Sequence, residues 1–155
     1  MTYETARTQL VAILEGSVAV SLTGGTTPRF RESVGADEEN PAQLRGFTLF
    51  GISDDVRIPF VARAQRHRVT RMELKVFYRH QADRKSLDLM LRSDHKVIGD
   101  RLIDPRLWAS ASSGIVSIEQ TGGALILHAD VESRDDGLIT HVYRFDLEYL
   151  SGAPA

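Results

Sequence analysis

Histidine and aspartate side chains are the residues of this chain whose types could support catalysis or metal binding. His128 and Asp130 share one face of a predicted strand over 124–132, and His141 lies in the next predicted strand, over 138–150. If the strand register brings the three together, they can bind a metal ion or exchange a proton. The apolar residues of both strands occupy odd-numbered positions, however, which favours a solvent-facing position for His128 and Asp130.

Other catalytic patterns do not occur in the sequence. It has no Gly-x-Ser-x-Gly elbow for a nucleophile and no His-x-x-x-His or His-Glu-x-x-His spacing for a metal. Gly24-Gly25 and Gly122-Gly123 lack the pattern of a phosphate-binding loop, and the absence of cysteine excludes thiolate ligands and disulfides. We therefore expect a protein that is not an enzyme and has no catalytic residue, no metal and no cofactor.

The most basic stretch of the chain runs from Ala62 to Arg71. It contains four arginines that could contact phosphates, namely Arg63, Arg66, Arg68 and Arg71. No aromatic residue stands among them to stack on a base, and the formal net charge of the chain is -2. A solvated face or an ion-paired contact between subunits is therefore favoured over a nucleic-acid site.

Length and composition indicate one globular domain over residues 1–155. A chain of 155 residues can bury a core without a metal or disulfide, and 42% hydrophobic with 26% charged residues is typical of globular proteins. No apolar run reaches the roughly 20 residues that a membrane helix needs, and the N-terminal residues lack a signal-peptide pattern. We expect no membrane association.

The first half of the chain predicts a helix, a long loop and strands. Thr2 can cap a helix over 3–15, and the alternation after it predicts a short strand over 18–22. Residues 26–46 contain Pro28, Pro41 and few large apolar side chains, which predicts an exposed loop. Strands are expected over 47–52 and, after a turn at Asp54-Asp55, over 56–61, where Pro59 indicates an edge or a connection.

The second half predicts a strand, a long helix and a meander. Alternation predicts a strand over 69–78, and apolar spacing predicts a helix over 84–103 that Pro105 ends. Asp94 falls on or beside the apolar stripe of this helix, where we expect a cation or a backbone amide to satisfy it. Strands over 115–120, 124–132 and 138–150 form an antiparallel meander, and residues 151–155 are expected to fray.

These elements predict an α+β fold with two layers, in which two helices pack on one face of a mainly antiparallel sheet. The order is helix, strand, strand, helix, strand, strand, strand. A long final strand leaves a sheet edge that must be covered, charged or paired with another subunit.

Three segments carry a resemblance to a known family. They read Arg-Met-Glu-Leu-Lys-Val-Phe-Tyr from Arg71, Leu-Asp-Leu-Met-Leu-Arg-Ser-Asp-His-Lys-Val-Ile from Leu87, and His-Val-Tyr-Arg-Phe-Asp-Leu-Glu-Tyr from His141. With the N-terminal helix and the loop before them, they resemble the tail terminator, or tail-completion, proteins of long-tailed bacteriophages. The likeness extends from Thr2 to Leu150 and lies in the order of the elements and the general pattern of residue types.

The resemblance implies a structural virion protein, made in the host cytoplasm, that forms a ring, commonly a hexamer, on the head-proximal end of the tail tube. Its implied partners are further copies of itself, the tail tube protein and the neck or connector protein, with DNA only passing through the lumen. Exposure and charge suggest the interface residues Arg29, Asp37, Glu38, Glu39, Arg63, Arg66, Arg68 and Arg71. A small ligand-binding or enzymatic domain using His128, Asp130 and His141, and a nucleic-acid-binding module using the four arginines, are the alternatives.

Overall fold

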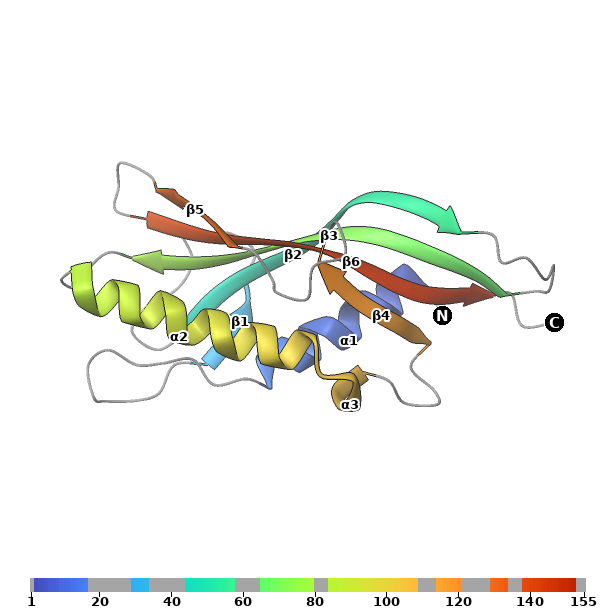
Figure 1. Cartoon of the computed structure of the whole chain (residues 1–155), viewed down its shortest axis with the longest axis horizontal. Coiled ribbons are helices and arrows are strands. Elements are labelled where there is room, and N and C mark those ends of the chain that lie inside the picture. Colours follow the sequence, from blue (N-terminus) through green and yellow to red (C-terminus); the bar gives the residue numbers. More distant parts are fainter. Residues whose placement is uncertain are drawn as a thin grey trace.

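The computed structural model of the chain describes residues 2–16, 29–33, 44–57, 65–79, 84–108, 114–120, 129–133 and 138–152. Figure 1 shows an elongated sheet with the helices along one side of it. In chain order the elements are α1 (Tyr3–Glu15), β1 (Arg29–Glu32), β2 (Leu44–Arg57), β3 (Gln65–Arg79), α2 (Arg84–Leu102), α3 (Pro105–Trp108), β4 (Ile115–Gln120), β5 (Ala129–Ser133) and β6 (Leu138–Gly152).

Helix α1 forms over the predicted residues, and hydrogen bonds satisfy groups at both of its ends. Thr2 caps the first turn by accepting a hydrogen bond at Oγ1 from the Thr5 amide at 3.2 Å. At the other end, Arg101 of α2 donates to the Ile13 carbonyl at 3.3 Å, which places a cation at the negative end of the helix dipole. The apolar stripe is fully or almost fully buried at Ala6, Leu10, Ile13 and Leu14.

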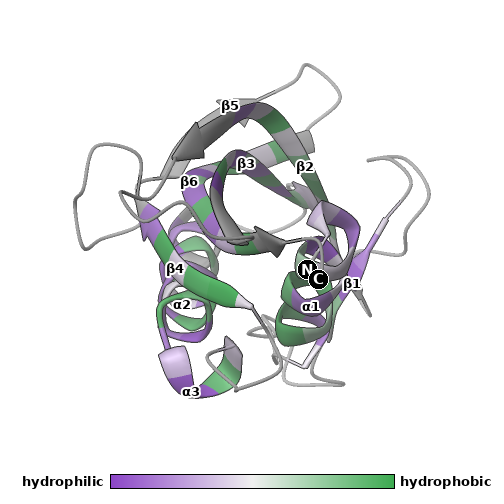
Figure 2. Ribbon diagram, turned by 90° about the vertical axis from the view of Figure 1, so that its right-hand side faces the viewer, coloured by the Kyte–Doolittle hydropathy of each residue, from purple (hydrophilic) through white to green (hydrophobic). Residues whose placement is uncertain are grey.

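One sheet contains the six strands of the described residues. Its order is β1-β2-β3-β6-β4, and β5 pairs with β6 beside this path. Only β1 and β2 run parallel; the other pairs are antiparallel. Seen from the end in Figure 2, the sheet curls over α1 and α2, so its concave side meets the helices.

Strand β2 differs from the prediction, because it continues through Asp54-Asp55 as one strand. The expected turn there is wrong. The register with β3 shifts between Gly51 and Ser53, so Ile52 is the extra residue of a β-bulge. Beyond the bulge pairing resumes, and Asp54 accepts a hydrogen bond from the Thr70 hydroxyl of β3 at 2.5 Å. At the bulge the strand bends and continues, where the sequence predicted that it would end.

The predicted loop over 26–46 also differs from the structure at both ends. Residues 29–32 form β1, which pairs with the first residues of β2, residues 44–47. The guanidinium of Arg7 holds this unit to α1, since it bonds both the Glu32 carboxylate and, at 2.9 Å, the Leu49 carbonyl. Asp37, Glu38, Glu39 and the strand predicted over 18–22 lie outside the described residues.

The core lies between the concave side of the sheet and the helices. Alternate residues of β3 and β6 supply one wall, and Met90, Ile98 and Leu102 of α2 supply part of the other. Trp108 covers the end of α2, where its indole Nε1 donates to the Leu102 carbonyl at 2.9 Å. The sole tryptophan of the chain is therefore a core residue.

The fold class is α+β, as predicted, with a corrected element order. The prediction missed β1 and α3, and it expected a frayed segment where β6 continues through Gly152. It placed the penultimate strand over 124–132, of which the structure describes β5 from Ala129. Among the described residues, no helix is long and apolar enough to cross a membrane.

Gly51 provides a test of how α1 is seated on the sheet. A Cβ at this position would lie 2.9 Å from the Tyr3 hydroxyl oxygen and 3.0 Å from Cγ2 of Thr70. We expect Gly51→Ala to lower the free energy of unfolding by about 1 to 3 kcal/mol, because either contact must shift. Urea unfolding followed by circular dichroism measures this difference.

Gly99 of α2 is the matched control, because a Cβ there meets no atom within 4 Å. Gly99→Ala should raise the free energy of unfolding by about 0.4 to 1 kcal/mol, since alanine favours the helix. Equal effects of the two substitutions would contradict the close packing at Gly51.

Candidate functional site

The structure describes only part of the predicted histidine and aspartate site. His128 lies outside the described residues. Asp130 of β5 pairs in register with Val142, whereas the β5 residue opposite His141 is Val131. Since adjacent positions of a strand face opposite sides, the position of Asp130 is not on the face of His141. The described residues hold no group of three or more His, Asp or Glu side chains arranged for a metal.

The arginines of the basic segment are not gathered on one face. Arg63 lies outside the described residues, and Arg66, Arg68 and Arg71 belong to β3. Arg66 and Arg68 occupy even positions of this strand and Arg71 an odd one, so strand alternation separates them. Arg71 is ion-paired with Asp146 of β6, at 3.4 Å from Nε to Oδ1. Arg29 lies in β1.

A buried polar cluster that the sequence analysis did not predict lies between α2 and the concave side of the sheet. It comprises Tyr78, Asp94, His95, His141 and Tyr143. The Tyr78 hydroxyl donates to Oδ2 of Asp94 at 3.0 Å, and the Tyr143 hydroxyl oxygen lies 3.0 Å from Nδ1 of His141. His95 stacks on the Tyr143 ring with centroids 5.5 Å apart, and its ring centroid is 5.9 Å from that of His141.

Each member of this polar cluster is placed by the period of its own element. Asp94 lies one turn from both Met90 and Ile98, so the helix turns its carboxylate toward the core. Tyr78 continues the buried even positions of β3, and His141 and Tyr143 are alternate residues of β6. A buried tyrosine hydroxyl needs a hydrogen-bond partner. This requirement could have predicted from the sequence that Tyr78 bonds Asp94.

Burial sets the protonation of the polar cluster. Desolvation first, and then the neighbouring His95, lower the pKa of His141 to about 4. Desolvation also raises the pKa of the Tyr143 hydroxyl, and the nearby Asp94 adds to this shift. At neutral pH the cluster therefore contains a neutral imidazole and a protonated phenol.

The position of the polar cluster suits a structural role. Tyr78, Asp94 and Tyr143 have no exposed surface and His141 has 6%. A substrate could not reach these atoms without displacing α2. The Tyr78 hydroxyl is one partner of Asp94, for which the sequence predicted a cation or a backbone amide. The cluster fixes how α2 sits on the sheet.

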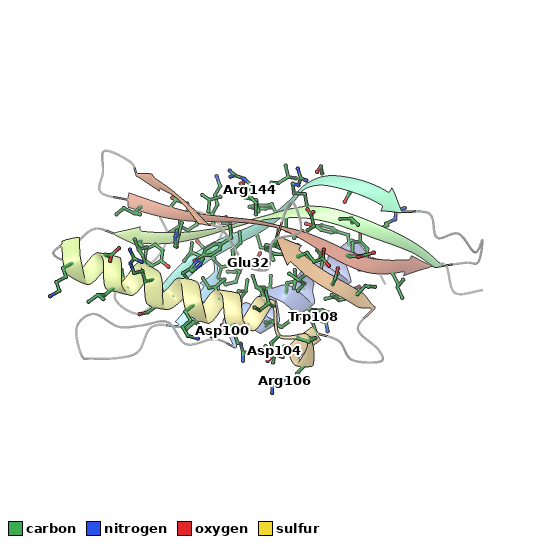
Figure 3. The ribbon with its side chains drawn as sticks, in the orientation of Figure 1. Glu32, Asp100, Asp104, Arg106, Trp108 and Arg144 are labelled. Carbon is green, nitrogen blue, oxygen red and sulfur yellow. The ribbon has the colours of Figure 1, made fainter. Side chains whose placement is uncertain are left out.

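The convex side of the sheet carries ion pairs. Glu73 of β3 lies 3.2 Å from Arg144 of β6 and 3.5 Å from Lys75, and the pair of Arg71 with Asp146 is on the same side. Figure 3 shows Arg144 on the side of the sheet away from the helices. Exposed pairs of this kind contribute little stability, about 0 to 1 kcal/mol each.

Apolar side chains stand in solvent at both edges of the sheet. On β2, Phe50 is 60% exposed and the bulge residue Ile52 is 52% exposed. A shallow pocket beside them is lined by Tyr3, Gly51, Ile52, Ser53, Asp54 and Thr70. On β4, Val116 is 40% exposed, and it too is the extra residue of a bulge, because the register with β6 shifts between Ile115 and Ser117. These two edges are the strongest candidate for a functional surface.

Comparisons with known proteins assign no family. The sequence matches no family model, and a search of curated proteins finds no significant match.

The low pKa of His141 makes stability depend on pH. In the unfolded chain the pKa of His141 is about 6.5. Between about pH 6.5 and about pH 4 the unfolded state therefore binds a proton at this residue that the folded state does not bind. The contribution of His141 to the free energy of unfolding is therefore fully present above about pH 6.5. It should be lost on acidification, which lowers the free energy of unfolding by about 2 to 3 kcal/mol. Urea midpoints measured over this range test the expectation.

His141→Gln is the control, because glutamine can still bond Tyr143 but does not titrate. Its stability should fall less steeply with acidification than that of the original protein. Parallel pH profiles for the two proteins would show that His141 is not the group responsible.

Removing the Tyr78 hydroxyl tests the bond to the buried carboxylate. Tyr78→Phe should lower the free energy of unfolding by about 1 to 3 kcal/mol, because Asp94 loses a hydrogen bond in a buried position. Tyr3→Phe removes a hydroxyl that accepts from the Gly51 amide at an exposed position, at 2.8 Å, and should have a smaller effect. A larger loss for Tyr3→Phe in urea unfolding would refute the importance of the buried bond.

Proposed function

We propose that the protein is a structural virion protein of a long-tailed bacteriophage. It assembles into a ring, with six copies as the expected number, on the head-proximal end of the tail tube. The ring ends polymerisation of the tube and offers a docking surface to the neck. The observation that carries this proposal is the exposure of Phe50 and Ile52 on a part of β2 that, among the described residues, pairs with β3 alone.

Exposed apolar side chains at a sheet edge favour association. An unpaired edge presents amide and carbonyl groups that a second strand can bond, and apolar residues beside it add to the contact. A tail terminator needs surfaces for its own copies, for the tube and for the neck. It needs no reactive group, so a polar cluster sealed in the core is compatible with the role.

The construction of the fold also supports an assembly role. The buried bond from Tyr78 to Asp94 ties β3 to α2, and the ion pair of Glu73 with Arg144 joins β3 to β6. A ring transmits position from one copy to the next, so it benefits from a rigid sheet. The likeness in element order and texture that the sequence carries to tail terminators is the basis for choosing this assembly over others.

The proposed role predicts a specific assembly and a specific effect on tube growth. Light scattering should give a mass several times the 17.2 kDa of the chain, and negative-stain images should show rings. Added to polymerising tail tube protein from the same virus, the protein should shorten the tubes, because capped ends cannot grow.

Ile52→Asp is the informative variant, because a charge at the exposed edge opposes association without touching the core. It should reduce both ring formation and tube capping, whereas Leu89→Asp, at an exposed position of α2, should leave both unchanged. A protein that stays monomeric at every concentration and leaves tube length unaltered would refute the proposed function.

A further inference from the structure

A small pocket lies beside the bulge of β2, at the start of α1. Its volume is about 130 Å³, and the described residues that line it are Tyr3, Gly51, Ile52, Ser53, Asp54 and Thr70. We propose that this pocket binds the guanidinium group of an arginine side chain from a different protein. The site goes beyond the proposed function and is present whether or not the protein forms a ring.

The pocket lies on the side of β2 that faces α1. Asp54 pairs in register with Thr70, which belongs to the buried even-numbered residues of β3, whereas Phe50 of β2 lies on the convex side. Tyr3 of α1 reaches the strand here, since its hydroxyl accepts from the Gly51 amide at 2.8 Å. The pocket is therefore a different surface from the exposed side chain of Phe50.

The lining presents hydrogen-bond acceptors and one negative charge. Its side-chain oxygens belong to the hydroxyls of Tyr3, Ser53 and Thr70 and to the carboxylate of Asp54. None of the lining residues that the structure describes carries a positive charge. A guanidinium group has five N–H donors in one plane and no acceptor, so it suits this lining, whereas phosphate and carboxylate ligands do not.

The Asp54 carboxylate is held in place and can still accept hydrogen bonds. The hydroxyl of the buried Thr70 donates to Oδ1 of Asp54 at 2.5 Å. Among the described residues this is the only hydrogen bond to the carboxylate, and no cation pairs with it. A carboxylate has about four lone-pair sites, so Oδ2 and part of Oδ1 remain for a ligand.

Two arginines near the pocket are paired with other carboxylates. Arg71 lies opposite Ser53 in the register of β2 with β3, and it pairs with Asp146 of β6. Arg7 lies in the second turn of α1 and pairs with Glu32 of β1. A cation for the pocket must therefore come from outside this set.

Ion pairs within each copy disfavour a second copy as the source of the arginine. Five arginines of the described residues are paired with carboxylates of their own copy, namely Arg7, Arg71, Arg92, Arg106 and Arg144. Binding of one of these to the pocket would break an existing pair for each pair that forms. An arginine without such a pair in its own protein gains more from the pocket.

The remaining part of the lining suits the rest of an arginine side chain. Ile52 is 52% exposed and can cover the methylene groups of the arginine. The aromatic ring of Tyr3 is a partner on which a flat guanidinium group can stack. Lysine would gain less, because its ammonium group is a compact point charge, so we expect selectivity for arginine.

Saturation-transfer difference NMR tests the site, because it detects weak ligands of large assemblies. The probe is the capped tripeptide acetyl-Val-Arg-Val-amide, and its counterpart with citrulline keeps the shape of arginine without the charge. The arginine peptide should bind. Both the citrulline peptide and the variant Asp54→Asn should show binding that is weaker by about tenfold. The control Asp100→Asn removes an exposed carboxylate of α2 and should leave the affinity unchanged.

The comparison of the two peptides uses the original protein, so it decides the question even if Asp54→Asn fails to fold. Equal binding of the two peptides, or unaltered binding by Asp54→Asn, would overturn the guanidinium site. An equal loss in Asp100→Asn would show a general effect of charge and also overturn it. Free arginine that binds as tightly as the peptide would assign the pocket to the amino acid and overturn the role of a partner protein.

Light scattering and tube length separate this site from the proposed function. Rings that shorten tubes but bind no arginine peptide would overturn the site and leave the proposed function standing. Arginine binding by a protein that stays monomeric and leaves tubes unaltered would support the site and refute the proposed function. Loss of rings in a folded Asp54→Asn variant would assign the pocket to a contact between copies and overturn the choice of a different protein.

Discussion

The antiparallel pairing of β3 with β6 is the constraint on which the rest of the structure depends. Its register sets Met72 beside Phe145 and Leu74 beside Tyr143 on the concave side, and Glu73 beside Arg144 on the convex side. A slip of one residue would turn each side chain of one strand to the other side of the sheet. The core, the polar cluster and the convex ion pairs would be lost together, so three kinds of interaction specify one register.

The polar cluster fixes the orientation of α2, which apolar packing alone does not fix. Hydrogen bonds depend on direction as well as distance, so the bond from Tyr78 to Asp94 restricts how α2 can rotate about its axis. Leu102 and Ile98 of the same helix would tolerate a range of rotations against an apolar wall. A buried polar group that loses its partner is costly, which makes other seatings of the helix unfavourable.

Local patterns predicted the parts of the fold that depend on neighbouring residues. Helix α1 was predicted with both ends correct because Thr2 and the apolar stripe are local signals, and the alternation of β3 was equally clear. The turn predicted at Asp54-Asp55 was wrong, because pairing with β3 and the bulge at Ile52 override a local turn preference. Strand β1 was not predicted, because its pairing with residues 44–47 is set only when the chain folds.

The candidate site was harder to predict because its members come from separate elements. His141 was singled out, but its neighbours Tyr78, Asp94 and His95 depend on the register of β6 and the rotation of α2. In the sequence Phe50, Ile52 and Val116 look like ordinary strand residues, whereas in the structure their side chains are exposed. Sequence patterns describe faces within an element, whereas a site requires the relation between elements.

Trp108 gives the molecule an optical reporter of its own. It is the only tryptophan of the chain, it is 7% exposed, and its indole bonds the last residue of α2. Emission excited selectively at tryptophan therefore arises from one apolar position at the junction of α2 and α3. A red shift of that emission signals water reaching the end of α2, so the docking of this helix can be followed in real time without any label.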